Sequence, residues 1–212
     1  MNLPSLTRHD ITGLILAGGR GTRMGGVDKG LQRLSGHSLV WHALQRLQPQ
    51  VDSVIINANR HLSEYGQLGV AVHPDPMEDF QGPLAGFLVG LLEARTPYVL
   101  TVPCDSPRFP LELAARLASA LQQEAADIAM VSAPEVTDQG ASVMRSQPVF
   151  CLLSKGLCAS LQTFLAAGER KIDRWTAQHR TVLVPFDQPQ DDPTAFANIN
   201  TLAELNALPA DS

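Results

Sequence analysis

Short apolar runs alternate along this chain with longer segments whose hydrophobic residues recur at helical spacing. The apolar runs, several of them rich in Val and Ile, predict strands at 11–17, 53–58, 69–73, 98–103, 127–133, 148–153 and 181–187. Hydrophobic residues three and four positions apart predict helices at 38–47, 61–66, 83–94, 110–123, 155–168 and 201–208. Because strands that alternate with helices are typical of a mostly parallel sheet with helices on its faces, the pattern predicts an α/β fold.

The run YVLTVP at 98–103 shows no polar alternation, which indicates a central strand buried on both faces. The polar segment 134–147 contains a glycine and carries no pattern that assigns it to a helix or a strand. We find no internal repeat, linker or low-complexity tract, so we expect residues 1–212 to form a single domain.

Composition and charge narrow the class of protein. With 44% hydrophobic and 17% charged residues, the chain has the composition of an ordinary soluble globular protein. No apolar run approaches the roughly 18 residues that cross a bilayer, and the first residues lack the apolar core of a secretory signal. We therefore expect a cytoplasmic protein with no membrane contact. The net charge of -5 argues against a general nucleic-acid binder.

Cysteine and histidine spacing disfavours a metal centre built from these residues. Cys104, Cys151 and Cys158 are odd in number and form no C-x-x-C pair, which argues against a disulfide framework and against a cysteine zinc site. The six histidines include no H-x-x-x-H pair. We expect reduced thiols in the core.

The stretch LILAGGRGTRMGGVDKG at 14–30 follows the first predicted strand and is rich in glycine. Glycines at the end of such a strand let backbone N–H groups approach phosphate oxygens. Arg20, Arg23 and Lys29 add local positive charge to an acidic protein. The stretch therefore predicts a site for a phosphorylated ligand.

Two common phosphate-binding motifs do not match this loop. A kinase-type P-loop needs Ser or Thr after its lysine, but Lys29 is followed by Gly30. The dinucleotide fingerprint needs a G-x-G-x-x-G spacing, and Gly19, Gly21 and Gly25 do not have it. The second predicted strand also ends without the acidic residue that binds a ribose in nicotinamide enzymes.

The loop contains Leu16-Ala17-Gly18-Gly19, Arg23-Met24-Gly25 and Lys29. In these residues it resembles the loop of nucleotidyltransferases that join a nucleoside monophosphate to an acceptor phosphate. Four further segments look like motifs of the same family, namely NANR at 57–60, GPLAG at 82–86, PCDSP at 103–107 and NINT at 198–201. Together they make the chain similar to the MobA-type molybdenum cofactor guanylyltransferases from about Ile11 to Leu208. The resemblance is weakest at 134–147.

This resemblance implies a Rossmann-like nucleotidyltransferase fold of the nucleotide-diphospho-sugar transferase type. It also implies transfer of GMP from GTP to the terminal phosphate of molybdopterin or Mo-molybdopterin, with Mg²⁺ as cofactor and pyrophosphate as second product. Further implied partners are the proteins that insert the metal into molybdopterin and the chaperones of molybdoenzymes. The half at about 11–110 would hold GTP and Mg²⁺, and the half at about 127–208 would hold molybdopterin.

Nucleotidyl transfer needs alignment and charge neutralisation more than covalent help from the protein. The catalytic candidates are accordingly Lys29, a compact point charge, and Arg23, a forked guanidinium, with Asp105 as the magnesium ligand. The resemblance places GTP contacts at Leu16, Ala17, Gly18, Gly19, Lys29, Asn57, Asp75 and Asp105, and a pterin side at Gly82, Gly86, Asn198 and Asn200.

Structural roles are the alternatives for several of these residues. Asn57 and Asp75 are equally well interpreted as turn formers. For Asp105 the metal role is favoured over a turn or helix cap before Pro107, and the two roles can coexist. Gly82 and Gly86 could serve packing, and Asn198 and Asn200 could hydrogen-bond at a strand end. For the basic residues at 170–174, a solvated helix end is favoured over contact with the acceptor phosphate.

Three other functions compete with guanylyl transfer. A molybdopterin cytidylyltransferase would share the fold, but its relatives carry L-A-A-G where this chain has L-A-G-G. A sugar-1-phosphate nucleotidyltransferase shares the glycine loop but lacks the NANR and GPLAG segments. A non-catalytic nucleotide-binding carrier would not need both Lys29 and Asp105.

Overall fold

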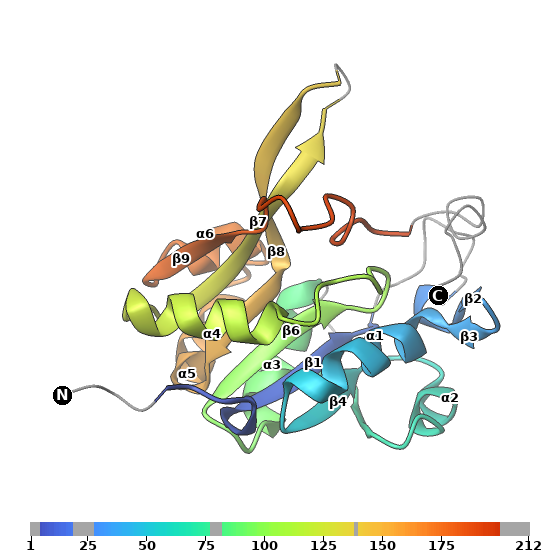
Figure 1. Ribbon diagram of the computed structural model, residues 1–212. Helices are drawn as coiled ribbons and strands as arrows, with labels where there is room; N and C mark the ends of the chain where they lie inside the picture. Colours follow the sequence, from blue (N-terminus) through green and yellow to red (C-terminus); the bar gives the residue numbers. More distant parts are fainter. Residues whose placement is uncertain (1–4, 19–27, 77–81, 138–139, 200–212) are drawn as a thin grey trace.

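The computed structural model describes residues 5–18, 28–76, 82–137 and 140–199 of the chain. Its main element is a seven-stranded sheet in the order β5-β4-β1-β6-β8-β7-β9 (Figure 1). The strands are β1 (Ile11–Leu16), β4 (Ser53–Asn57), β5 (Ala71–His73), β6 (Tyr98–Pro103), β7 (Ile128–Val136), β8 (Ser142–Ser154) and β9 (Thr181–Pro185). β8 runs antiparallel to both of its neighbours, and every other pairing in the sheet is parallel.

Helices cover both faces of this sheet (Figure 1). α1 (Leu39–Leu47) and α4 (Leu113–Gln123) bury their apolar sides in one core cluster, and α3 (Pro83–Glu93) and α5 (Cys158–Ala166) bury theirs in the other. Two short helices, α2 (Leu62–Gly66) and α6 (Ile172–Thr176), lie beside them. Four 3-10 turns, η1 (Arg8–Asp10), η3 (Lys29–Leu31), η4 (Gln48–Gln50) and η5 (Lys155–Leu157), and a small hairpin of β2 (Arg33–Leu34) and β3 (His37–Ser38) complete the described elements.

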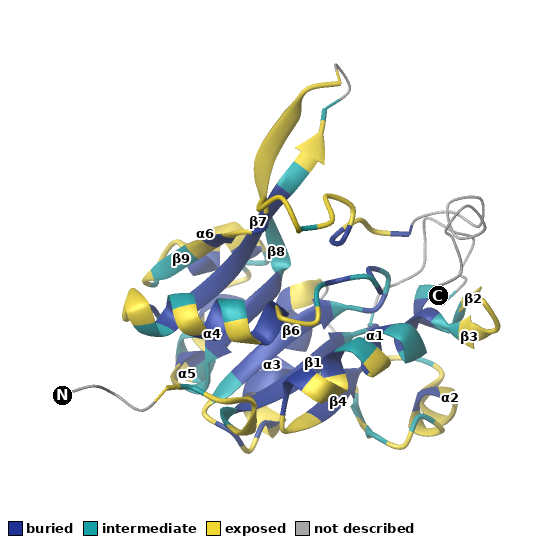
Figure 2. Cartoon of the chain, viewed as in Figure 1, coloured by how far each residue is buried: buried dark blue, intermediate teal, exposed yellow. Residues whose placement is uncertain are grey.

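Burial follows the layers of the fold. The central strands are dark blue along almost their whole length, whereas the helices show buried inner sides and exposed outer sides (Figure 2). In β6, every residue from Val99 to Val102 is buried, as the unbroken apolar run predicted. The predicted α/β fold with a mostly parallel sheet is confirmed.

Several element boundaries differ from the prediction. α4 begins at Leu113 rather than at residue 110, because the residues after Pro110 form a turn before the helix. β7 and β8 extend into segment 134–147, for which the sequence predicted neither a helix nor a strand. There they form an antiparallel ribbon, of which residues 138–139 are not described. The helix predicted at 201–208 lies outside the described residues.

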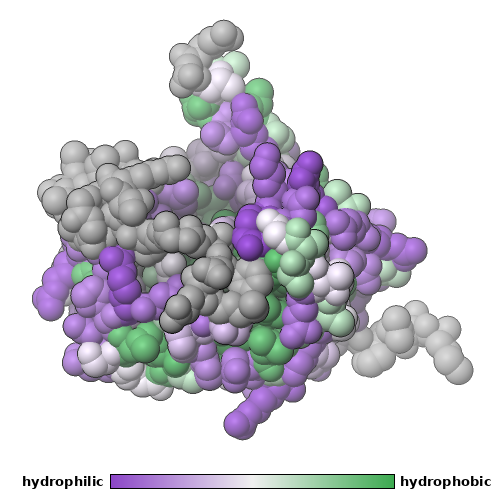
Figure 3. Space-filling model, turned by 180° about the vertical axis from the view of Figure 1, so that it is seen from behind, coloured by the Kyte–Doolittle hydropathy of each residue, from purple (hydrophilic) through white to green (hydrophobic). Residues whose placement is uncertain are grey.

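The β7–β8 ribbon projects beyond the rest of the sheet (Figure 1). It is mostly exposed, and its apolar residues stand among polar ones (Figures 2 and 3). Val136 is 73% exposed, and the ion pair between Arg145 and Glu135 is exposed as well. A ribbon with so little burial gave no hydrophobic pattern to predict it from.

Two expectations from composition can be compared with the described residues. In that part of the chain no helix is both long and apolar enough to cross a membrane. Cys104 and Cys151 are buried free thiols, and Cys158 is a half-buried one.

Candidate active site

The predicted GTP contacts that the structure describes gather at the carboxyl ends of four adjacent strands, β5, β4, β1 and β6. Leu16, the last residue of β1, pairs with Asn57 at the end of β4 and with Pro103 at the end of β6. Past these ends, the Ala17 amide donates to the Asn57 carbonyl at 2.8 Å, and the Cys104 amide donates to the Leu16 carbonyl at 3.1 Å. Open α/β sheets bind ligands at this edge.

Lys29 and Asp105 meet at this edge although 76 positions separate them. The Lys29 Nζ donates to the Asp105 Oδ2 at 3.2 Å, and the two side chains are 30% and 18% exposed. Partial burial lowers the local dielectric constant, so these charges act more strongly on each other than a pair on the open surface would. The pair presents one cation and one carboxylate to the same space.

Two residues that the sequence did not single out support this pair. Asp28 Oδ1 accepts hydrogen bonds from the Gly30 amide at 3.1 Å and from the buried Tyr65 hydroxyl at 2.6 Å. Burial raises the pKa of Tyr65 far above its ordinary value, so this hydroxyl remains a neutral donor. No motif marked Tyr65, whose only signal was its place in a short helical segment.

Cys104, which precedes Asp105, is a buried free thiol. Burial, followed by the nearby carboxylates of Asp105 and Asp28, raises the pKa of its thiol well above the ordinary value. A buried neutral thiol is a poor nucleophile, so nothing here points to covalent catalysis through Cys104.

A second polar network joins the ends of β4 and β5. Asp75 accepts from the Asn57 amide at Oδ1 (2.9 Å) and from the Asn59 amide at Oδ2 (2.8 Å). The Asp75 backbone amide in turn donates to the Asn59 Oδ1 at 2.7 Å. Asn57 is only 3% exposed, and its amide also donates to the His73 carbonyl at 3.2 Å. The carboxylate and both amides are therefore fixed in place before any ligand binds.

Two predicted glycines are explained by the position of Asn57. A Cβ at Gly86 would lie 2.6 Å from the Asn57 Oδ1 and would overlap the Leu16 side chain. A Cβ at Gly18 would lie 3.0 Å from the same oxygen. Both glycines make room for the Asn57 amide. Gly86, predicted on the pterin side, is buried in α3 against two of the predicted GTP contacts.

A model of the MobA-like NTP transferase domain matches residues 13–199. The chain belongs to this family. It is 63% identical over 201 residues to a molybdenum cofactor guanylyltransferase of Acidovorax sp. (strain JS42), covering 94% of this chain and 95% of that protein. It is 52% identical over 203 residues to the Bordetella pertussis protein of the same name, covering 96% and 98%. The predicted resemblance is confirmed, and the chain is a nucleotidyltransferase.

Two solved structures share the fold of this chain. A molybdopterin-guanine dinucleotide biosynthesis protein A from Archaeoglobus fulgidus superposes with a TM-score of 0.70 at 20% identity, covering 92% of this chain and 95% of that one. A 4-diphosphocytidyl-2C-methyl-D-erythritol synthase from Anaerococcus prevotii gives 0.68 at 14% identity, covering 93% of each. The two comparisons show a common fold, and at these identities they do not identify the substrate of this chain.

Of the remaining predicted residues of this MobA-like chain, the structure describes some and not others. Gly82 caps α3 at a φ of +123°, a conformation that favours glycine. Asn198 accepts at Oδ1 from the Ser106 hydroxyl at 2.6 Å, and the neighbouring Ile199 amide donates to the Asp105 carbonyl at 2.8 Å. The late asparagine therefore lies beside the turn that carries Asp105. Gly19, Arg23 and Asn200 lie outside the described residues.

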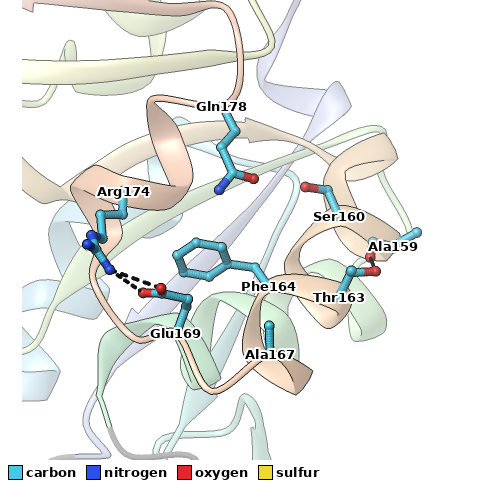
Figure 4. Close-up of a pocket in the computed structure, with 8 residues that line it drawn as sticks. All are labelled: Ala159, Ser160, Thr163, Phe164, Ala167, Glu169, Arg174 and Gln178. Atoms are coloured by element: carbon cyan, nitrogen blue, oxygen red, sulfur yellow. Dashed lines mark hydrogen bonds and ion pairs between the residues drawn. The ribbon is translucent and has the colours of Figure 1, made fainter.

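Two of the three basic residues at 170–174, Arg170 and Arg174, have structural partners. Arg170 donates to the Leu165 and Glu169 carbonyls near the end of α5, and Arg174 pairs with the Glu169 carboxylate at 2.9 Å. Figure 4 shows the Arg174–Glu169 pair at the side of a cavity of about 800 Å³. Its described lining comes from residues 159–178 and includes none of the predicted site residues. The helix-end interpretation of this basic patch fits these contacts.

Asp105 is also a suitable ligand for a divalent cation. Within the described ranges, no three His, Cys, Asp or Glu side chains come close enough to form a metal cage. Mg²⁺ does not need one, because it is commonly bound through one or two carboxylates together with substrate phosphates and water. A partly exposed carboxylate beside a lysine fits that kind of site.

Proposed function

We propose that this protein transfers GMP from GTP to the terminal phosphate of molybdopterin, forming the guanine dinucleotide cofactor and releasing pyrophosphate. The observation that carries the proposal is the Lys29–Asp105 pair beside the Asn57–Asp75 network, in a chain of the MobA-like family. The names of its close relatives support the same reaction.

We assign to the predicted site residues the charges and hydrogen-bonding groups that this transfer requires. One phosphate attacks another, so the main barrier is charge repulsion and alignment. We assign Lys29, together with Arg23, to neutralising the triphosphate, and Asp105 to holding Mg²⁺. When bound, Mg²⁺ polarises phosphate oxygens as a Lewis acid. We assign contacts with the nucleotide to backbone groups of Leu16, Ala17, Gly18 and Gly19.

Guanine recognition is assigned to the Asn57–Asp75 network. Guanine presents the N1–H and N2–H₂ donors beside the O6 acceptor, so its site needs a fixed acceptor and a nearby donor. Asp75 is an acceptor whose orientation is set by Asn57 and Asn59. A preorganised carboxylate discriminates between bases, since a base without matching donors leaves its remaining lone pairs without hydrogen bonds.

We assign the half at about 127–208, including Asn198 and Asn200, together with Gly82, to molybdopterin. Residues 1–212 would act as one domain in the cytoplasm. Proteins that insert the metal and chaperones of molybdoenzymes are the partners that this product implies.

A direct assay tests the reaction. Purified protein is incubated with molybdopterin, Mg²⁺ and each nucleoside triphosphate in turn, and pyrophosphate release is followed. We expect release with GTP and only background release with CTP, ATP or UTP. Release with a sugar 1-phosphate in place of molybdopterin, or no release with any acceptor, would overturn the proposal.

Two substitutions test the catalytic pair. Lys29→Ala and Asp105→Asn should each lower kcat/KM for GTP by roughly 10²-fold or more, because each removes a charge that acts on the reacting phosphates. Arg8→Ala is the control, since it removes an exposed cation of η1, at the opposite end of β1 from Leu16. Wild-type turnover in either site variant would refute its assigned role.

A further inference from the structure

The turn that carries Lys29 is fixed on both sides of the lysine. Asp28 precedes it and is the N-cap of the 3-10 turn η3. Its Oδ1 accepts from the amide of Gly30, the residue that follows the lysine, at 3.1 Å. The Asp28 carbonyl accepts from the Leu31 amide and from the Gln32 side chain, both at 3.3 Å. The backbone at Lys29 is therefore closed into a tight loop by its neighbours.

Tyr65 connects this turn to the body of the protein. It comes from α2, 37 positions further along the chain, and it is fully buried. Its hydroxyl donates to the Asp28 Oδ1 at 2.6 Å, the oxygen that also caps Gly30. One carboxylate oxygen thus joins a buried side chain to the backbone that follows the lysine.

Gly30 shows how closely these groups pack. A Cβ at this position would overlap the Tyr65 hydroxyl and would lie 3.3 Å from the Cys104 Sγ. The turn therefore rests directly on Tyr65 and on the residue before Asp105. The two ends of the Lys29–Asp105 pair are built on one packed unit.

We propose that Asp28 and Tyr65 are positioning residues for nucleotidyl transfer, which set the place of the Lys29 ammonium relative to the Asp105 carboxylate. This inference rests on the proposed function. A lysine side chain has several rotatable bonds, so a fixed backbone is needed to aim it. Displacement of a catalytic group by about 1 Å can cost on the order of 10²-fold in rate.

Tyr65→Phe removes the hydroxyl and keeps the buried ring. We expect kcat to fall about tenfold, with KM for GTP changed less than threefold and the melting temperature lowered only slightly. Asp28→Ala should lower kcat similarly, and Asp28→Asn, which keeps an oxygen acceptor, should recover most of that loss. Tyr98→Phe is the matched control, because Tyr98 lies at the start of β6, away from the site.

A double-mutant cycle separates positioning from a general structural effect. If Tyr65 acts through Lys29, then Tyr65→Phe should cause no further loss of kcat/KM once Lys29 is already Ala. An undiminished tenfold loss in the Lys29→Ala background would overturn the proposal. Unchanged kcat in Tyr65→Phe would overturn it as well.

A chemical measurement tests the inference without using the guanylyl transfer activity. Acetylation of Lys29 in the protein without substrates is followed by mass spectrometry, with Lys155 and Lys171 as internal references. We expect Lys29 to react at least threefold faster in Tyr65→Phe than in the wild type. Equal rates would overturn the positioning role. Absent transfer in the wild type together with faster labelling would refute the proposed function alone.

Discussion

At the scale of single residues, the site depends on two glycines, which have no side chain, as much as on its polar side chains. Gly18 and Gly86 come from different elements, yet a Cβ on either would press against the Asn57 Oδ1. Because the Asn57 amide also donates to Asp75 and to the His73 carbonyl, it cannot turn aside without breaking those bonds. The two glycines therefore allow a fixed amide at the strand ends.

This packing predicts the effect of Gly86→Ala. The added methyl group should displace the Asn57 amide, weaken GTP binding about tenfold and lower the free energy of unfolding by about 1–3 kcal/mol. Titration calorimetry with GTP and denaturant unfolding measure the two effects. Gly66→Ala in α2 is the control, because a Cβ there has open space. Unaltered GTP affinity in Gly86→Ala would contradict this account of Asn57.

Sequence and structure differ in which residues they bring out at this scale. Lys29 and Asp105 were predicted through a family resemblance, and the structure brings their side chains together. Asp28 and Tyr65 were missed because their importance lies in one hydrogen bond between distant segments. A buried tyrosine in a short helical segment has no local pattern that distinguishes it from ordinary core.

At the scale of elements, an ion pair joins the chain after β9 to α4. Arg116 of α4 contacts the Asp191 carboxylate at 2.6 Å and stacks on the Phe186 ring at 3.7 Å. The Asp191 side chain is only 3% exposed. Burial alone would raise the pKa of Asp191. The Arg116 guanidinium and the Gln188 amide together lower it by more than burial raises it, so the pKa lies below its ordinary value.

This depressed pKa predicts a pH-dependent contribution to stability. A group whose pKa is lower in the folded state stabilises the fold above its unfolded pKa, near 4, and loses that effect as the pH falls through the folded value. Asp191→Asn should thus lower the free energy of unfolding by about 1.5 kcal/mol at pH 7. The difference from wild type should shrink below about pH 4.

Chemical denaturation at several pH values measures this difference. Asp187→Asn, an exposed substitution nearby, should show a much smaller effect at every pH. A difference for Asp191→Asn that stays constant down to pH 3 would contradict the assigned pKa.

The elements themselves were predicted where a hydrophobic pattern existed. Every strand of the seven-stranded sheet was predicted, whereas the short β2 and β3 were not. β6 was predicted with its bounds of 98–103, because burial on both faces leaves an unbroken apolar run. The ribbon at 134–147 escaped prediction since it buries almost nothing. The antiparallel direction of β8 was also invisible, because strand direction depends on pairing rather than on composition.

At the scale of the whole molecule, an acidic chain with a net charge of -5 gathers cationic and anionic groups at one sheet edge. If that edge binds GTP, then GTP must stabilise the folded state by mass action. At 100 times its dissociation constant, a ligand adds about 2.7 kcal/mol, which raises the melting temperature by about 5–11 °C for a protein of this size.

Differential scanning fluorimetry with Mg²⁺ and each nucleotide measures this shift. GTP should give the full shift, and CTP at the same concentration should give a much smaller one. Equal shifts for GTP and CTP would show that the base contributes little to binding.

The contact between the last described segment and the Asp105 turn has a consequence for biosynthesis. Strands β1, β4, β5 and β6, together with Lys29, Asn57, Asp75 and Asp105, all precede residue 106, so a ribosome makes them before the segments that follow. Asn198, which lies 92 positions beyond Ser106, and Ile199 are made later and bond to Ser106 and Asp105. We therefore expect a nascent chain to assemble the edge that carries Lys29 and Asp105 early and to secure the Asp105 turn only after residue 199 has been made.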